Sequence, residues 1–282
     1  MSNFWARTIT GLSMVFILLA GLYFNGFIFA SLFFVIAILG ILEFYQIVSS
    51  ENCQPQKIFG AVAGALLYLA ITGIHYIPFS YDYISLIFIP FFLPIPLFFL
   101  PFIIEIYRKK PEPLKNIAFT ILPIFYIALP LALLNLINDK NAFHFLGFPV
   151  FLTGYFILTW SFDTGAYLYG KQFGKHKLFE RISPKKTWEG TLGGSGIALL
   201  VAAVLFFLVK DIQLIDWLAL TFMILVFGSF GDLVESLIKR NLNIKDSGTI
   251  LPGHGGILDR FDSILISAPF VFLYFIIRFP YS

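Results

Sequence analysis

Acidic residues that could hold a metal ion recur in three separate stretches of this sequence. Asp163 lies in FDTGAY, Asp232 in GSFGDLVES, and Asp259 and Asp262 in LDRFD. Asp259 and Asp262 are three residues apart, so on a helix they would face the same side. Carboxylate oxygens suit Mg²⁺, which proteins usually bind through a few carboxylates together with substrate phosphates and water. A Mg²⁺ site is therefore favoured. The alternative is a set of ion pairs with three nearby cations, Lys239, Arg240 and Arg260.

A glycine-rich loop precedes the last pair of acids. In PGHGG, Gly253, Gly255 and Gly256 permit positive φ angles and a close approach of the backbone to a ligand. Successive backbone N–H groups in such a loop can form a concave site for an anion. Taken alone, a glycine-rich motif of this kind is more often only a turn.

A basic loop at 171–188, KQFGKHKLFERISPKKTW, offers a second anion site. Ser183 is a suitable N-cap and Pro184 a suitable first helical residue, which predicts a helix starting there. Lys185 and Lys186 would then lie in the first turn, where the helix dipole disfavours cations unless an anion docks. The alternative is a basic patch on anionic lipid, and His176 is interpreted as part of that exposed loop.

The elements that must position these residues are apolar helices. The chain is 59% hydrophobic and 12% charged, against roughly 25% charged residues in soluble domains. Continuous apolar runs of about 20 residues are long enough to cross a bilayer as helices. We therefore predict an all-α, polytopic membrane protein with about nine transmembrane helices, at 8–24, 27–48, 58–77, 84–107, 114–137, 149–170, 189–209, 214–238 and 262–279.

The distribution of cations orients these spans. With nine spans, sixteen of the nineteen lysines and arginines fall on one side of the membrane, which marks that side as cytoplasmic. The N-terminus is then inside and the C-terminus outside. At 1.5 Å per residue, Asp163 lies about 21 Å along its span, and Asp232 lies about 24 Å along its own if that span enters the bilayer near Asp216. Both would lie in the cytoplasmic half, near Asp259 and Asp262 at the start of the last span.

The chain divides by composition into a scaffold and a catalytic region. Residues 1–148, with five spans, carry few internal charges and show Gly60/Gly64 spacing that suits close helix packing. Four prolines in the 84–107 span predict a bent packing helix, with a lateral lipid gate as the alternative. Residues 149–282, with four spans and the loops 171–188 and 239–260, hold the candidate chemistry. The single cysteine, Cys53, excludes an intramolecular disulfide.

The run SLIKRNLNIKDSGTILPGHGGILDRFD, from Ser236 to Asp262, closely resembles the signature of the phosphatidate cytidylyltransferases, also called CDP-diacylglycerol synthases. The motifs ISPKKTWEG and FDTGAY are similar to other motifs of that family. The resemblance covers roughly the C-terminal 45% of the chain. It implies a membrane enzyme that joins CTP to phosphatidic acid with Mg²⁺, giving CDP-diacylglycerol and pyrophosphate.

The resemblance also suggests roles for individual residues. Asp232 and Asp259 would be the central Mg²⁺ ligands, assisted by Asp163 and Asp262. Five cations would bind phosphates: Lys185, Lys186, Lys239, Arg240 and Arg260. Six further residues are expected at the site, the first three without an assigned role: Lys245, Asp246, His254, Ser236, Gly255 and Gly256.

Two alternatives to this function stay open. One is a related CTP-dependent enzyme acting on another lipid acceptor, and the other is a secondary transporter whose intramembrane carboxylates carry ions. The expected partners are CTP, phosphatidic acid and membrane lipid, with no nucleic acid; formation of a homo-oligomer is left open. The expected location is a bacterial inner membrane, with the active site on the cytoplasmic side.

Overall fold

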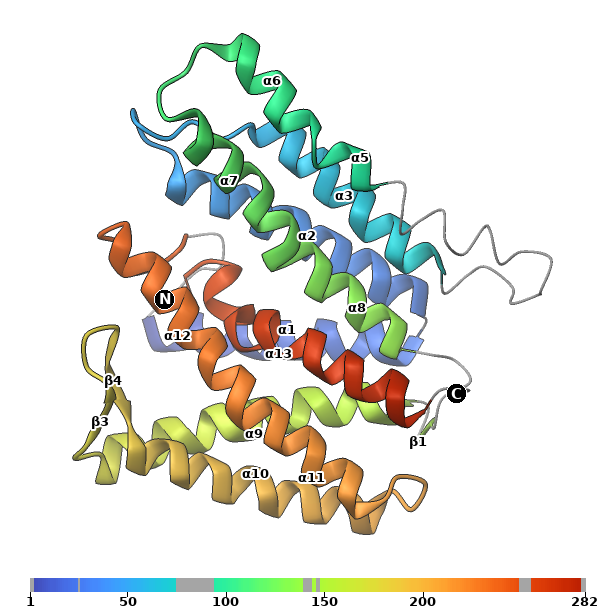
Figure 1. Cartoon of the computed structure of the whole chain (residues 1–282). Helices are drawn as coiled ribbons and strands as arrows, with labels where there is room; N and C mark the ends of the chain where they lie inside the picture. Colours follow the sequence, from blue (N-terminus) through green and yellow to red (C-terminus); the bar gives the residue numbers. More distant parts are fainter. Residues whose placement is uncertain are drawn as a thin grey trace, which may run out of the picture. The chain divides into compact units, whose positions relative to one another are not determined.

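The chain folds into helices that group into two compact units. The computed structural model in Figure 1 describes residues 3–24, 26–74, 94–138, 144–145, 148–248 and 255–279. Unit 1 comprises residues 1–139 and 246–260, and unit 2 comprises residues 140–245 and 261–282. The short segment 246–260 thus groups with the N-terminal helices, and the last helix begins in unit 1 and continues in unit 2.

Unit 1 is a bundle of apolar helices with an aromatic core. Its helices are α1 (Asn3–Phe24), α2 (Gly26–Val48), α3 (Lys57–Ile74), α5 (Pro94–Leu97), α6 (Leu100–Arg108), α7 (Pro113–Pro123), the π-helical turn η2 (Ile124–Ala128) and α8 (Leu129–Ile137). The predicted packing role of Gly60 and Gly64 is confirmed. A Cβ on Gly60 would collide with the Tyr45 ring, and one on Gly64 would lie 2.5 Å from Ile41 Cδ1.

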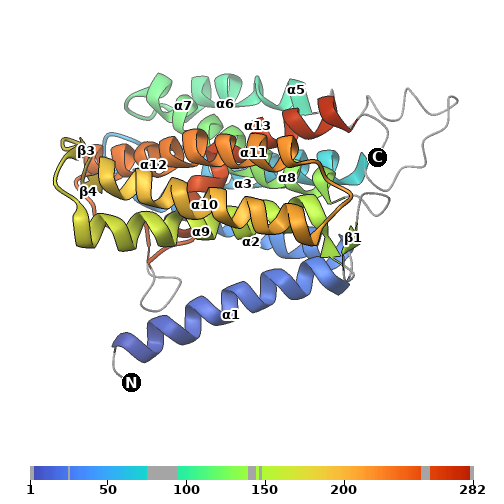
Figure 2. The same cartoon turned by 90° about the horizontal axis from the view of Figure 1, so that it is seen from below.

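Unit 2 contains the remaining helices and two small hairpins. Its elements are β1 (His144–Phe145), β2 (Phe148–Pro149), α9 (Val150–Phe173), β3 (Lys177–Phe179), β4 (Ser183–Thr187), α10 (Trp188–Leu208), α11 (Leu214–Met223), the π-helical turn η3 (Ile224–Gly228), α12 (Ser229–Asn241) and most of α13 (Leu258–Arg278). Helices α9 and α10 run side by side, and the β3–β4 hairpin joins them at one end (Figures 1 and 2).

The predicted class, an all-α polytopic membrane protein, is confirmed. Within the described residues, five helices are long and apolar enough to cross a membrane: Gly26–Val48, Pro113–Ile137, Trp188–Leu208, Leu214–Asn241 and Leu258–Arg278. Helix α1 covers the predicted span 8–24, and α9 covers 150–170 of the predicted span 149–170. Helix α3 covers 58–74 of the predicted span 58–77, and residues 75–77 lie outside the described residues. The 84–107 span lies partly outside the described residues, which give it only the short helices α5 and α6. The count of nine spans therefore stays a prediction.

The predicted helix start at Ser183 is wrong. Residues 183–187 form the strand β4, which pairs antiparallel with β3 through Lys177–Thr187 and Phe179–Ser183. The N-cap of the next helix is Thr187, whose side chain accepts a hydrogen bond of 3.1 Å from Gly190 N. Ser-Pro resembles a helix start locally, but pairing with β3 keeps this backbone extended. Lys185 and Lys186 therefore lie before the helix, and the dipole argument does not apply to them.

Candidate active site

Polar side chains from three parts of unit 2 meet at Asp232 on α12. Lys186, near the end of β4, forms an ion pair with Asp232 Oδ2. Ser263 in the first turns of α13 donates its hydroxyl hydrogen to Asp232 Oδ1 at 2.7 Å. Both carboxylate oxygens of Asp232 are therefore engaged, one by a cation and one by a hydroxyl group.

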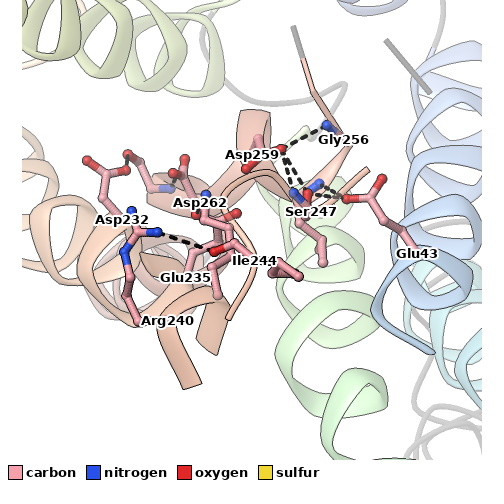
Figure 3. Close-up of polar contacts among 12 residues, drawn as sticks. Glu43, Asp232, Glu235, Arg240, Ile244, Ser247, Gly256, Asp259 and Asp262 are labelled. Atoms are coloured by element: carbon pink, nitrogen blue, oxygen red, sulfur yellow. Dashed lines mark hydrogen bonds and ion pairs between the residues drawn. The ribbon is translucent and has the colours of Figure 1, made fainter. Parts of the chain in front are cut away.

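Two further predicted acids belong to this cluster. Asp163 on α9 interacts electrostatically with Asp232 and with Lys186. Asp262 on α13 interacts with Asp163 and Asp232, and with Glu235 one turn farther along α12. Figure 3 includes Asp232, Glu235 and Asp262 among its labelled side chains. The predicted convergence of acids from three helices is thus present for Asp163, Asp232 and Asp262.

Close backbone contacts hold the helices that carry these acids together. On α12, a Cβ on Gly231 would lie 3.0 Å from Ser263 Cα and would collide with the Asp262 carbonyl oxygen. Between α9 and α10, a Cβ on Gly165 would lie 2.9 Å from Gly194 Cα. Because these glycines have no side chain, α12 approaches α13 directly beside Asp232, and α9 approaches α10 close to Asp163.

Lys239 contributes to this region through an ion pair on α12. It pairs with Glu235 at the i, i+4 spacing, and both side chains are largely buried, with 12% and 5% of their surface exposed. From the sequence, ion pairs of the acids with Lys239, Arg240 and Arg260 were the alternative to a metal site. In the structure such pairs coexist with a group of mutually close carboxylates.

A second cluster lies in unit 1, around a residue that the sequence analysis missed. Glu43 on α2 is fully buried and accepts hydrogen bonds from Ile257 N at 2.8 Å and Leu258 N at 3.1 Å, the backbone groups at the start of α13. It also accepts one from the hydroxyl of Ser247. An ionisable residue inside an apolar span is costly and usually marks function, and this signal was present at Glu43 in the sequence.

Asp259 belongs to the same cluster and organises the loop that precedes α13. Its Oδ2 atom accepts hydrogen bonds from Gly256 N at 2.8 Å and from Ser247 N at 3.0 Å, and it also lies 3.0 Å from the Ser247 hydroxyl oxygen (Figure 3). One carboxylate oxygen of this predicted Mg²⁺ ligand is thus directed at the protein backbone.

Two glycines of the loop meet different structural requirements, one of backbone conformation and one of space. Gly255 has a φ of 86°, a conformation that glycine adopts readily and that its motif permits. Gly256 is needed for space instead, because a Cβ there would collide with Glu43 Oε1 and with the Ser247 hydroxyl. Gly253 and His254 lie outside the described residues.

The other predicted site residues are more exposed. Arg240 donates a hydrogen bond of 3.2 Å to Ile244 O within unit 2, and Ser236 is half-buried on α12. The exposed members of the set are Lys185, Arg240, Lys245, Asp246 and Arg260. His176, interpreted from sequence as one more exposed loop residue, is exposed but contacts Glu189 through its Nδ1 at 2.5 Å.

The side chains gathered in unit 2 are of the types that bind a hard divalent cation. Asp163, Asp232 and Asp262 supply carboxylate oxygens and Ser263 a hydroxyl, which are the ligand types of Mg²⁺. In the part of the chain that the structure describes, no three acidic, histidine or cysteine side chains already surround one point as metal ligands. Lys186 contacts Asp232 Oδ2, so a cation bound by Asp232 would share this carboxylate with the Lys186 ammonium group.

Comparison with known proteins assigns the chain to a family. The model of the cytidylyltransferase family matches residues 5–278. The chain therefore belongs to the cytidylyltransferase family.

Three similar proteins bear the name phosphatidate cytidylyltransferase. The one from Staphylococcus haemolyticus is 53% identical over 116 residues, which are 40% of this chain and 44% of the relative. The one from Bacillus subtilis is 54% identical over 123 residues, 43% of this chain and 45% of the relative. The one from Staphylococcus aureus is 52% identical over 115 residues, 40% of this chain and 44% of the relative. The matched segments thus cover less than half the length of these relatives.

Proposed function

We propose that this protein transfers the cytidylyl group of CTP to phosphatidic acid, giving CDP-diacylglycerol and pyrophosphate for phospholipid synthesis. The observation that carries the proposal is the family match over residues 5–278. Two further points support it. Similar proteins are named phosphatidate cytidylyltransferase, and a cluster of acids beside a lysine lies within membrane helices, where a lipid phosphate and a soluble nucleotide could meet.

The reaction needs charge neutralisation and positioning more than a covalent intermediate. A phosphate oxygen of phosphatidic acid attacks the α-phosphorus of CTP, the new P–O bond forms, and the bond to the β-phosphate oxygen breaks as pyrophosphate leaves. Cations fixed around the transferred group stabilise its charge. Lys186 is held in place by its contact with Asp232, and the exposed Lys185 and Arg260 are accessible to phosphates.

Asp163, Asp232, Asp259 and Asp262 are the proposed holders of Mg²⁺, with Asp232 and Asp259 as its central ligands. When bound, Mg²⁺ supplies electrostatic stabilisation to the phosphate oxygens. The protein's own groups orient these carboxylates: Ser263 binds Asp232, and Ser247 and Gly256 bind Asp259. Arg240, Lys239 and Ser236 are further candidates for contact with phosphate, and Lys245, Asp246 and His254 are candidate site residues.

We further propose a bacterial inner-membrane location, with the N-terminus and the active site on the cytoplasmic side. The excess of lysine and arginine in the predicted loops on one side supports this orientation. CTP is a polyanion that does not cross lipid unaided, so a site that uses it must open to the compartment that contains it.

The proposed reaction can be tested with the purified full chain in mixed micelles of detergent and phosphatidic acid. CTP labelled at the α-phosphate and Mg²⁺ are added, and label in the lipid fraction is followed together with released pyrophosphate. Equal amounts of lipid-bound label and pyrophosphate are expected. Pyrophosphate release without labelled lipid, or no turnover at all, would contradict the proposal.

The same assay separates the alternatives. A related enzyme with another acceptor would be inactive with phosphatidic acid but active with a lipid extract from a bacterial membrane. A transporter would show neither product. The family match favours the enzyme over the transporter.

A further inference from the structure

Glu43 is a buried carboxylate within residues 1–148, the region that the sequence suggests is a scaffold. Its side chain is fully buried on α2, inside a helix of 23 residues that carries no other charged residue. Its known partners lie more than 200 residues away in the sequence, at Ser247, Ile257 and Leu258. These partners lie on both sides of a segment, 249–254, that is outside the described residues.

The contacts of Glu43 fix the first turn of α13. The first backbone N–H groups of a helix have no partner within the helix itself. Glu43 accepts from Ile257 N and Leu258 N, at the beginning of α13. A negative charge at a helix N-terminus is also favoured by the helix dipole. Glu43, a residue of a different helix, therefore caps the N-terminus of α13. The capped backbone groups directly precede Asp259.

Glu43 is also linked to Asp259 through Ser247. The Ser247 hydroxyl contacts Glu43 Oε1 and lies 3.0 Å from Asp259 Oδ2. A serine has one hydroxyl hydrogen, so it can donate to only one of the two carboxylates at a time. The state of one carboxylate thereby influences the hydrogen bonding of the other.

We propose that Glu43 is a positioning residue for the metal-binding carboxylate Asp259. By holding Ser247 and the first turn of α13, it fixes the orientation of the Asp259 side chain. When Asp259 binds a cation, Ser247 can direct its hydrogen wholly to Glu43. This inference rests on the proposed function, because it takes Asp259 as a Mg²⁺ ligand.

The variant Glu43→Gln tests the proposal with little change in shape. The amide of glutamine offers one acceptor oxygen and one nitrogen that only donates, so it cannot satisfy Ser247 and both backbone N–H groups. Loss of a residue that orients a metal ligand typically weakens metal binding by about 10- to 100-fold. We expect the midpoint of a Mn²⁺ titration, followed by electron paramagnetic resonance without substrates, to rise by at least about tenfold.

Glu105→Gln is the matched control. Glu105 is also a buried carboxylate of unit 1, and it accepts hydrogen bonds from Gln56, Asn116 and Arg108. It has no contact with residues 247, 256 or 257 among the hydrogen bonds of the described chain. The control should lower thermal stability without moving the Mn²⁺ midpoint, since a reduced folded fraction lowers the signal amplitude and not the midpoint.

A Mn²⁺ midpoint for Glu43→Gln within about twofold of the wild type would overturn the proposal, as would an equal shift in Glu105→Gln. If Glu43→Gln does not fold, Ser247→Ala and Glu43→Asp decide the question in the same titration. Unchanged midpoints in both would overturn it, and raised midpoints would support it. An unmodified protein that binds Mn²⁺ but makes no labelled lipid would instead contradict the proposed function alone.

Discussion

Lys186 forms an ion pair with Asp232, although 46 residues of sequence separate them. The β3–β4 hairpin carries Lys186, and α12 carries Asp232. The two side chains are 26% and 21% exposed, so the pair is partly screened by solvent and its contribution to stability is small. The ion pair matters for position, because it connects the basic β3–β4 hairpin to the acidic cluster, which also contains Asp163 and Asp262.

Replacing Asp232 should therefore abolish most activity without preventing folding. Asp232→Asn keeps the shape of the side chain but removes the charge that attracts Lys186 and the proposed cation. We expect kcat/KM to fall at least about 100-fold. This corresponds to a loss of about 2.8 kcal/mol of transition-state stabilisation. The measurement is CTP-dependent labelling of lipid, with gel filtration as a check on folding. Turnover close to that of the unmodified protein would exclude Asp232 as a ligand.

The control for this experiment should be Asp211→Asn. Asp211 is exposed between α10 and α11, and its replacement should leave turnover unchanged. Asp216 is unsuitable as a control. It is buried and accepts hydrogen bonds from Tyr274 at 2.6 Å and Arg278 at 2.7 Å, so its loss would disturb the packing of α13.

The two lysines of β4 should behave differently from lysines outside the motifs. Changing Lys185 and Lys186 together to alanine should raise the KM for CTP at least tenfold, because a hydrogen bond to a charged group contributes about 1.5–3 kcal/mol. The measurement is steady-state kinetics at varied CTP in neutral and in anionic mixed micelles.

The matched control pair is Lys110 and Lys115, which are exposed in unit 1. Lys109 is left unchanged because it forms the left-handed C-cap of α6, with a φ of 50°. If the hairpin only attracts anionic lipid, both double variants will show the same small effect and will respond to micelle charge. That result would remove the hairpin from the nucleotide site.

The sequence predicted the helices and much of the acidic cluster for a simple reason. Long apolar runs and rare acids within them are signals that a short stretch of sequence displays by itself. Asp163, Asp232 and Asp262 are acids of this kind, each within or at the start of an apolar run. Two features depend on partners far away in the chain and were not predicted. Pairing with β3 determines that residues 183–187 form a strand, and the role of Glu43 depends on backbone N–H groups at Ile257 and Leu258.

The orientation of the membrane spans gives a separate prediction. Cysteine placed at Lys175 or Lys245, both exposed, should be protected from an impermeant thiol reagent in right-side-out vesicles and become reactive when the vesicles are opened. The native Cys53 is only 2% exposed and should give little background labelling. Labelling of either new cysteine in intact vesicles would reverse the proposed orientation.

The contact between α12 and α13 predicts opposite outcomes for two glycine substitutions. Gly231→Ala would place a Cβ 3.0 Å from Ser263 Cα and against the Asp262 carbonyl oxygen, so α12 must move away from α13. Because Asp232 follows Gly231 directly, this movement would separate Asp232 from Ser263, and turnover should fall at least about tenfold, the equivalent of 1.4 kcal/mol.

Gly196→Ala on α10 is the control, because a Cβ there meets nothing within 4 Å. Alanine in a helix interior is favoured over glycine by roughly 0.5–1 kcal/mol, so this variant should keep full activity and be slightly more stable to heat. Activity and thermal unfolding would be measured for both proteins in the same detergent. Full activity in Gly231→Ala would mean that close contact between α12 and α13 is not required for catalysis, since the helices would have separated without loss of turnover.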